Sequence, residues 1–564
     1  MAVLSAACAS AGDDLATQPV QELPQASAEL ATQPVQDLPQ ASADLPNQPV
    51  QELSQTEAVS PWWNDTVFYE IFVRSFYDSD GDGIGDLPGL IQKLDYLNDG
   101  DPKTTNDLGV TGLWLMPIHP AASYHGYDVI DYFSVNPEYG SLDDFKRFLE
   151  EAHQRGLRVI IDLVLNHTST KHPWFIVSQT PSSPYRDWYI WSDTKPGGLG
   201  WHESSSGFYY GIFWEGMPDL NYRNPEVTDK MRGVTRFWLE EVGVDGFRLD
   251  GVKHLVEEGS IQAHAQGTHS WLREFRTFYK GLNPQAFGVG EIWDISLAVS
   301  KYVTNEEVDL AFSFDLAQAM VTSARLGRAY DVARVLRREV GLFPSGQFGT
   351  FLTNHDQERA MYWFTGESGK ARVAAGLLLT SPGVPFIYYG EEIGMTGKKP
   401  DEQIRTPMQW SSAENAGFTN GEPWIAVNPD FAEGVNVASQ TADDASLLSY
   451  YRELIGFRSR HAALRVGEFF LAESDHKTVL AFLRVSEDEI LLVVINLGRE
   501  PVQDYSLSMK EGPLLGTYLA EPIFGYSGSA LELVASQQGA FESYQPVPEL
   551  KAQHTLILQL QPGR

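Results

Sequence analysis

The sequence has one cysteine, Cys8, in 564 residues, so no disulfide can form within the chain. No run of about 20 apolar residues occurs, which argues against a transmembrane helix. Basic residues are scarce, since 41 Lys and Arg stand against 75 Asp and Glu and give a net charge of −34. Because so acidic a surface repels nucleic acid and anionic lipid, neither is expected as a partner.

The first 58 residues lack Lys, Arg and almost all aromatic side chains. Residues 15–58 repeat an imperfect 15-residue unit that begins LATQPVQELPQASAE. This Pro-, Gln- and Ala-rich composition predicts a disordered tether, with a partner-binding repeat as the alternative. The start, MAVLSAACAS, is similar to the end of a lipoprotein signal, although a basic region and a full apolar core are missing. We expect a bacterial extracellular or cell-surface protein, attached to a membrane only by a lipid on Cys8, unless that cysteine occurs there by chance.

Strand-like and helix-like segments alternate over some 400 residues after Trp62. Apolar strand segments are expected near residues 67, 112, 158, 245, 287, 309, 348 and 384, with helices between most of them. This alternation predicts an α/β fold, a (β/α)8 TIM barrel. A doubly wound open sheet is the alternative, but no Gly-rich phosphate loop follows the first strand.

Two regions depart from the alternation. Residues 168–222 are rich in Ser, Pro, Gly, Trp and Tyr and predict a loop-rich subdomain inserted after the third strand. Short alternating strands after about residue 466 predict a C-terminal antiparallel β-sandwich. The expected parts are the tail (1–58), the first part of the barrel (59–167), the insertion (168–222), the second part of the barrel (223–464) and the sandwich (465–564).

The stretch Gly243–His254, GVDGFRLDGVKH, places Asp250 at the end of a predicted strand. Arg248 lies two residues earlier and therefore on the same face of the strand. Its guanidinium would keep Asp250 ionised and oriented, as a carboxylate nucleophile requires. A structural Arg–Asp pair at the rim of a barrel would have the same sequence.

Other polar residues also follow predicted strands. Glu291 and Asp356 come at strand ends, as do His167 and His355. Because active sites of TIM barrels lie at the C-terminal ends of the strands, these side chains are expected to converge. Paired carboxyl groups in a cleft with Trp, Tyr and His favour glycoside hydrolysis.

An acidic loop, YDSDGDGIGDL, follows the first predicted strand. Its aspartates stand at loop positions one, three, five and nine, a spacing that favours calcium. Position twelve is Gly89 rather than Glu, so the loop is not an ordinary EF-hand, and a solvated acidic turn is the alternative. The proposed ligands are Asp78, Asp80, Asp82, Asp86 and the backbone oxygen of Ile84.

Four motifs resemble those of the α-amylase family, glycoside hydrolase family 13, and occur in that family's order. They are DLVLNH (162–167), GFRLD (246–250), GEIW (290–293) and TNHD (353–356), and MPDLN (217–221) is similar to a fifth short motif. The resemblance covers residues 62–564. It implies that Asp250 is the nucleophile, Glu291 the general acid/base and Asp356 a clamp on sugar hydroxyls.

The resemblance also implies a retaining mechanism, for which two carboxyl groups about 5 Å apart and a raised pKa of Glu291 are expected. It implies a second calcium ion held by Asn166, Asp219 and the backbone oxygen of His254. The residues implied to bind substrate are His125, Tyr127, His167, Arg248, Lys253, His254, His355 and Arg405.

The motifs resemble more than one subfamily of this family. The pair Lys253–His254 is similar to α-amylases, and Tyr124 stands where α-glucosidases carry an aspartate. MPDLN resembles the subfamily between oligo-1,6-glucosidases and neopullulanases, and RTPMQW (405–410) resembles oligo-1,6-glucosidases. We expect a monomeric endo-acting α-amylase that hydrolyses α-1,4 bonds of starch and maltooligosaccharides, with some transglycosylation. An exo-acting α-glucosidase or oligo-1,6-glucosidase-like enzyme is the alternative, and a non-catalytic glucan-binding protein is a third.

Overall fold

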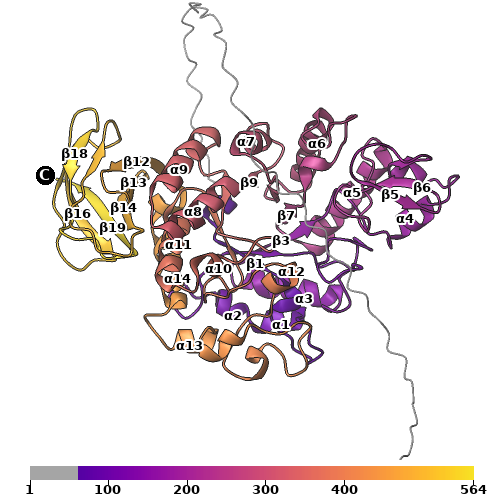
Figure 1. Ribbon diagram of the computed structural model, residues 1–564, viewed down its shortest axis with the longest axis horizontal. Coiled ribbons are helices and arrows are strands. Elements are labelled where there is room, and N and C mark those ends of the chain that lie inside the picture. The colour runs from indigo at the N-terminus through magenta and orange to yellow at the C-terminus, as the bar shows by residue number, and fades with distance from the viewer. Residues whose placement is uncertain (1–60, 564) are drawn as a thin grey trace, which may run out of the picture. The chain divides into compact units, whose positions relative to one another are not determined.

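The computed structural model describes residues 61–563 (Figure 1). The predicted tether, its repeats and Cys8 lie outside these residues. Between residues 61 and 563 no helix is both long and apolar enough to cross a membrane.

Eight parallel strands close into a barrel in the order β1-β11-β10-β9-β8-β7-β3-β2. This confirms the predicted TIM barrel. The strands are β1 (Phe68–Ile71), β2 (Gly112–Leu115), β3 (Arg158–Leu163), β7 (Gly246–Leu249), β8 (Phe287–Gly290), β9 (Leu310–Phe312), β10 (Phe348–Thr350) and β11 (Val384–Tyr388).

Helices follow most of these strands and surround the barrel (Figure 1). They include α1 (Leu87–Gln92), α2 (Leu94–Leu97), α3 (Leu142–Gln154), α5 (Pro225–Arg236), α6 (Gln266–Leu282), α7 (Ser296–Thr304), α8 (Phe314–Leu326), α9 (Tyr330–Leu342), α10 (Ala360–Phe364), α11 (Ser368–Thr380), α12 (Asp401–Ile404), α13 (Val437–Thr441), α14 (Leu447–Arg460) and α15 (Ala462–Val466). Local chemistry sets their ends. In α3, Ser141 accepts a hydrogen bond from the backbone N–H of Asp144, whose carboxylate accepts one in return, which is a capping box.

The inside of the barrel changes from apolar to polar along its axis. Alternate residues of a strand share a face, so Phe68 and Glu70 of β1 both point inward, as do Ile160 and Asp162 of β3. The lower layers are filled by an apolar cluster that includes Phe68, Ile160, Phe287, Val289, Leu310, Phe312, Val384 and Phe386. At the C-terminal ends of the strands the inward positions become charged, which places polar chemistry at that rim.

The insertion between β3 and α5 contains α4 (Pro173–Ser178) and a small antiparallel sheet in the order β4-β6-β5. These strands are β4 (Trp191–Ser192), β5 (Trp201–Ser204) and β6 (Gly207–Tyr210). A β-bridge between His167 and Asp219 joins the two ends of the insertion. The residues after β3 and the MPDLN segment are therefore held side by side at the barrel rim.

The C-terminal region forms an antiparallel sheet in the order β17-β16-β19-β14-β13-β12-β15-β18. Leu507, Leu533 and Phe541, from strands near its two edges, share one core with Val494 and Leu558 from its centre, so the sheet folds over itself as a sandwich requires. The strands are β12 (Glu468–Ser474), β13 (Val479–Val485), β14 (Ile490–Asn496), β15 (Leu507–Met509), β16 (Gly516–Phe524), β17 (Leu533–Ala535), β18 (Phe541–Tyr544) and β19 (His554–Pro562).

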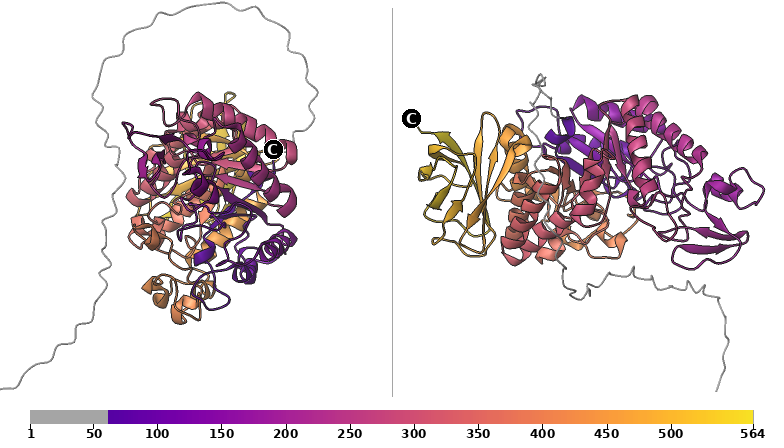
Figure 2. Two further views of the ribbon diagram at one scale, coloured as in Figure 1. Left: turned by 90° about the vertical axis from the view of Figure 1, so that its right-hand side faces the viewer. Right: turned by 90° about the horizontal axis from the view of Figure 1, so that it is seen from above.

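Close contacts attach this sheet to the barrel. The buried side chain of Arg484 in β13 donates a 2.8 Å hydrogen bond to the carbonyl oxygen of Thr380 at the end of α11. Gly376 of α11 lies so near Thr555 in β19 that a Cβ atom would come within 2.3 Å of its Oγ1. The insertion lies on the opposite side of the barrel from this sheet, as both views show (Figure 1 and Figure 2).

Candidate active site

Arg248 connects the acids at the C-terminal rim of the barrel. It is only 1% exposed. Its Nη1 lies 2.5 Å from Asp162 Oδ1 and 2.7 Å from Asp250 Oδ1, and its Nη2 lies 3.0 Å from Glu291 Oε2. Strands β3, β7 and β8 are neighbours in the barrel, so their ends bring these three carboxyl groups around one guanidinium.

The surroundings of these acids favour an extra proton. Burial raises the pKa of Glu291, and the negative charges of Asp250 and Asp356 raise it further. Burial also raises the pKa of Asp250, against the opposing charge of Arg248. The pKa of Asp162 is raised to about 7, again chiefly by burial. One cation among three carboxyl groups therefore favours a mixed state, in which some are ionised and at least one is protonated near neutral pH.

Asp356 has the opposite electrostatic character. Burial alone would raise its pKa, but His355 and Arg405 outweigh burial and hold the pKa far below its usual value. His355 Nε2 lies 3.3 Å from Asp356 Oδ2, and Arg405 Nη2 lies 2.9 Å from Oδ1. Arg405 also lies 3.2 Å from Asp401. Asp356 is thus a permanently ionised acceptor beside a pair of acids that can hold a proton.

Tyr127 joins these two groups. Its hydroxyl lies 2.6 Å from His355 Nε2, and its ring is stacked 5.4 Å from the imidazole. The guanidinium of Arg248 lies 5.6 Å from the centre of the same ring. His125 supports this turn, because its Nδ1 accepts a 3.2 Å hydrogen bond from the backbone N–H of Tyr127.

His167 contributes an unpaired ring to the same rim. It is 1% exposed, and neither ring nitrogen has a hydrogen-bond partner. Burial lowers its pKa to about 3, so the imidazole is neutral. Phe213 of the insertion packs edge-on against His167 at 5.3 Å and against His254 at 5.5 Å. A buried neutral imidazole with free nitrogens is suited to a polar ligand such as a sugar hydroxyl.

The segment after Asp250 forms one border of the site. Gly251 lies against Phe213, because a Cβ atom on this glycine would be 2.9 Å from the phenylalanine ring. The backbone N–H of Gly251 donates a 2.9 Å hydrogen bond to Glu291. Lys253 Nζ donates to the carbonyl oxygen of Trp293 at 2.7 Å. His254 Nδ1 lies 2.7 Å from the carbonyl oxygen of Gln262.

The acidic loop brings together Asp78, Asp80 and Asp86, whose carboxylate oxygens lie within 4.8 Å of one another. Asp82 lies outside this group, and its carboxylate accepts a 2.8 Å hydrogen bond from the backbone N–H of Ile84. Asp78 accepts hydrogen bonds from the backbone N–H groups of Gly81 and Gly83. Asp86 accepts hydrogen bonds from the backbone N–H groups of Ser79 and Gly89. Asp78 also accepts from the backbone N–H of Asp80 and from the hydroxyl of Thr419, so its four lone-pair positions are all used and a cation there would have to replace at least one of these bonds.

Two of the residues expected to hold a second cation, Asn166 and Asp219, meet at the base of the insertion. Asp219 Oδ2 and Asn166 Nδ2 are buried and have no hydrogen-bond partner, and turning the Asn166 amide over would present its oxygen. Glu257 adds a carboxyl group, whose Oε1 is also buried without a partner. Burial raises the pKa of Asp219, and the charge of Glu257 raises it further. Two carboxyl groups, each with one buried oxygen that has no partner, and an amide fit a hard cation that takes oxygen ligands, while the other oxygen of Asp219 accepts the backbone N–H of Ile212.

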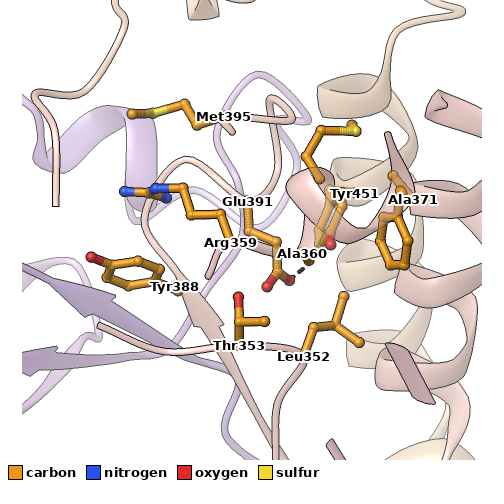
Figure 3. A pocket seen from close by; sticks show the side chains of 11 residues that line it. Leu352, Thr353, Arg359, Ala360, Ala371, Tyr388, Glu391, Met395 and Tyr451 are labelled. Atoms are coloured by element: carbon orange, nitrogen blue, oxygen red, sulfur yellow. Dashed lines mark hydrogen bonds between the residues drawn. The ribbon is translucent and has the colours of Figure 1, made fainter. Parts of the chain in front are cut away.

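A small internal cavity lies behind the segment that carries Asp356 (Figure 3). Its walls include Thr353 and Arg359, which flank Asp356 in the sequence, and Glu391. Tyr451 donates a 2.9 Å hydrogen bond to Glu391, and burial raises the pKa of that carboxyl to about 8. The volume of roughly 10 Å³ is no more than one water requires, so this cavity is not a sugar site.

Comparison with known proteins agrees with this geometry. Residues 70–467 match the family model described as the α-amylase catalytic domain. The chain belongs to the α-amylase family. It is accordingly an enzyme of the class that hydrolyses glycosidic bonds.

Relatives of this α-amylase-family enzyme have more than one activity. The chain is 39% identical to α-amylase 3 of Dictyoglomus thermophilum, over 81% of this chain and 89% of that protein. It is 33% identical to an oligo-1,6-glucosidase of Parageobacillus thermoglucosidasius, over 78% of this chain and 91% of that one. The crystal structure of the α-amylase from H. orenii aligns with a TM-score of 0.75 and 41% identity, over 88% of this chain and 99% of that one.

Four residues of the enzyme's rim were missed by sequence reasoning, and Asp162, which contacts Arg248, is one of them although its motif was recognised. Glu70 interrupts the apolar run FYEIF. A charged residue inside such a run is expected to be buried and therefore to need a partner, so the interruption was the signal that could have identified Glu70. Phe213 and Glu257 lie in segments without periodicity, so nothing in the sequence showed that they would meet the predicted residues.

Proposed function

We propose that this enzyme is a retaining, endo-acting α-amylase that hydrolyses α-1,4 bonds of starch and maltooligosaccharides. The observation that supports this best is the sharing of Arg248 between Asp250 and Glu291. One guanidinium orients both carboxyl groups toward the same space. The two acids differ in their hydrogen bonds. Glu291 also accepts one from the backbone N–H of Gly251, whereas Asp250 accepts its side-chain hydrogen bond, among the described residues, from Arg248.

In the proposed reaction, Asp250 attacks the anomeric carbon while Glu291 gives its proton to the departing glycosidic oxygen. The C–O bond to the leaving chain breaks and an ester bond to Asp250 forms, which inverts the anomeric centre. Glu291, now ionised, then removes a proton from water, which attacks the same carbon and releases Asp250. The second inversion restores the α-configuration. Asp356, His355 and His167 hold the hydroxyls of the reacting ring.

Exposed aromatic side chains near Glu291 support an endo mode of action. Phe213, which packs on Gly251, is 43% exposed, and Trp293, two residues after Glu291, is 49% exposed. Trp293 lies against Phe314 at 4.6 Å in a stacked arrangement, so the indole has one face free. Aromatic faces stack on sugar rings, and a rim with several of them can bind further glucose units on the leaving-group side.

An exo-acting enzyme is the second candidate, supported by the opposite side of the site. Arg405 lies 3.4 Å from the hydroxyl of Tyr124, and the ring of Tyr124 stacks on Trp424 at 5.3 Å. These three side chains form a wall beyond Asp356 that could end the site after one glucose unit. The relatives named oligo-1,6-glucosidase favour the same alternative.

A product time course on maltoheptaose and soluble starch tests the proposal. An endo-acting enzyme gives mixed short oligosaccharides early from both substrates. Glucose alone from the outset supports the exo alternative, and products longer than maltoheptaose show transglycosylation. If the wild type releases no sugar but binds starch, the protein is a non-catalytic glucan-binding protein. The Asp250→Asn variant is the control, because it removes the proposed nucleophile and keeps the shape of the side chain.

We further infer that calcium binds at Asp78, Asp80 and Asp86, and a second ion at Asn166, Asp219, the backbone oxygen of His254 and Glu257. Both ions would join loops by adding positive charge between carboxylates. We also propose that the enzyme is a monomer, and that it lies outside the cell or at its surface, the latter from the sequence around Cys8.

A further inference from the structure

Glu70 is a buried carboxylate at the C-terminal end of β1. It is 2% exposed, and its Oε1 lies 2.5 Å from His355 Nδ1. Across residues 61–563, His355 is its only ion-pair partner. Burying a carboxylate is costly unless a positive partner compensates, so the contact implies charge on the imidazole.

His355 lies between two carboxylates. Glu70 can only accept, so Nδ1 carries a proton. On the other side of the ring, Nε2 faces Asp356 Oδ2 at 3.3 Å and the hydroxyl of Tyr127 at 2.6 Å. The ring is fully buried and packs edge-on against Trp114 at 5.7 Å, so it cannot turn away. Two acceptors on opposite nitrogens of a fixed ring favour the imidazolium.

We propose that Glu70 is a positioning residue that keeps His355 doubly protonated, so that Nε2–H always points as a donor toward Asp356 and the reacting sugar. Glu70 touches no substrate and acts only through His355. The inference rests on the proposed hydrolytic function, in which His355 binds a hydroxyl of the reacting ring.

The other groups near His355 agree with this charge. The pKa of His355 is raised to about 10, because the charges of Asp356 and Glu70 outweigh burial. Asp162 and Asp250 add negative charge on the same side of the barrel. Arg405 donates a 2.9 Å hydrogen bond to the carbonyl oxygen of His355. The groups facing the ring are Glu70 from β1, Tyr127 from the loop after β2, Asp162 from β3, Arg248 from β7, Asp250 just after β7, and Asp356 and Arg405 from the loops after β10 and β11.

The Glu70→Gln variant tests the proposal, because the amide keeps the shape and can still accept from Nδ1 but carries no charge. Loss of an opposite charge at this range lowers a pKa by about 1–3 units. Nitrogen-15 NMR of labelled histidine is the first readout. In the wild type His355 keeps imidazolium shifts through pH 8, and in Glu70→Gln it titrates at a lower pH.

The pH profile of kcat/KM is the second readout. The wild type should lose activity at high pH with a slope of one, as Glu291 loses its proton. In Glu70→Gln the slope steepens toward two, since His355 now deprotonates in the same range, and kcat/KM falls about a hundredfold for each pH unit above both midpoints, compared with about tenfold in the wild type. A merely structural role would lower activity equally at all pH values.

Glu392→Gln is the matched control. Glu392 is a buried carboxyl near the same rim, but it accepts from Tyr69 and Tyr96 rather than from a histidine. Its variant should leave the NMR titration of His355 and the slope of the pH profile as in the wild type.

The NMR experiment needs no substrate, so its outcome is separate from that of the proposed function. Neutral His355 in the wild type at pH 7 overturns the proposal, even if Glu70→Gln does not fold. An unchanged titration in folded Glu70→Gln overturns it as well. An imidazolium in an enzyme that hydrolyses no glucan supports the role of Glu70 on His355 and refutes only the proposed reaction.

Discussion

Replacing Asp250 by alanine should abolish hydrolysis without unfolding the protein. Arg248 keeps two carboxyl partners, Asp162 and Glu291, so its buried charge remains compensated. Burial raises the pKa of Asp250 above its value in the unfolded chain, so its ionised form costs stability near pH 7. Removing the carboxylate therefore removes that cost. By the same reasoning, the Asp250→Asn variant should melt at or above the wild-type temperature.

The catalytic loss should be large because no other group can form the glycosyl ester. Loss of a residue from a covalent catalytic unit lowers kcat by about 10⁴–10⁶-fold. Since each tenfold is about 1.4 kcal/mol, the lost transition-state stabilisation is about 5–8 kcal/mol. The assay is chromatography of maltoheptaose and its products, with and without sodium azide, because a glycosyl azide adds no new reducing end.

Azide also distinguishes the two acids. With Asp250→Ala, azide can enter the space of the lost carboxylate and attack the anomeric carbon, which gives a β-glycosyl azide while Glu291 protonates the leaving group. With Glu291→Ala, azide attacks the glycosyl-Asp250 intermediate from the opposite face and gives the α-anomer. The reasoning is refuted if Asp250→Ala keeps more than about a hundredth of the wild-type kcat, or if the two anomers are exchanged.

Three further predictions concern substrate binding, charge and metal. Trp293→Ala should raise KM for maltoheptaose about 2- to 12-fold, because an aromatic contact contributes about 0.5–1.5 kcal/mol. Leu531→Ala, which removes an exposed apolar side chain in the C-terminal region, should leave KM unchanged. Equal KM values in the two variants would contradict a role of the aromatic rim in binding. Asp356→Asn should lower Tm most below pH 6.5, because the raised pKa of His355 adds stability that is complete below 6.5 and is lost as pH rises through about 10. Melting curves from pH 5 to 10 check this, and a Tm difference independent of pH would contradict it. EDTA should lower the wild-type Tm, and added calcium should restore it. At a calcium concentration a hundredfold above Kd, binding adds about 2.7 kcal/mol to the free energy of unfolding. Glu257→Gln should need more calcium for the same recovery of Tm. Indifference of the Tm to chelation would argue against both cation sites.

The sequence alone predicted much of the barrel and its rim. Strand and helix periods are local, so the eight strands could be read without tertiary information. The alternation of side chains along β7 was also local, and it correctly placed Arg248 beside Asp250. Motif order then indicated the family that the comparison showed.

The loops were predicted less completely, because their conformation has no period. Asp82 was grouped with the other aspartates from its spacing, but its carboxylate instead caps the backbone of Ile84. Phe213 meets the segment after Asp250 only because the insertion folds back over the rim. Glu257 approaches Asp219 through a turn that no pattern in the sequence announces.

What the sequence by itself determined is therefore the list of strands, their inward-facing residues and the acids at their ends. What only the tertiary structure decided is which of those residues touch. Glu70 and His355 are 285 positions apart, and they meet because closing the barrel pairs β1 with β11 and so places β10, whose following loop carries His355, only two strands from β1. Local sequence encodes the direction of a side chain, whereas barrel closure and strand register set the distance between two of them.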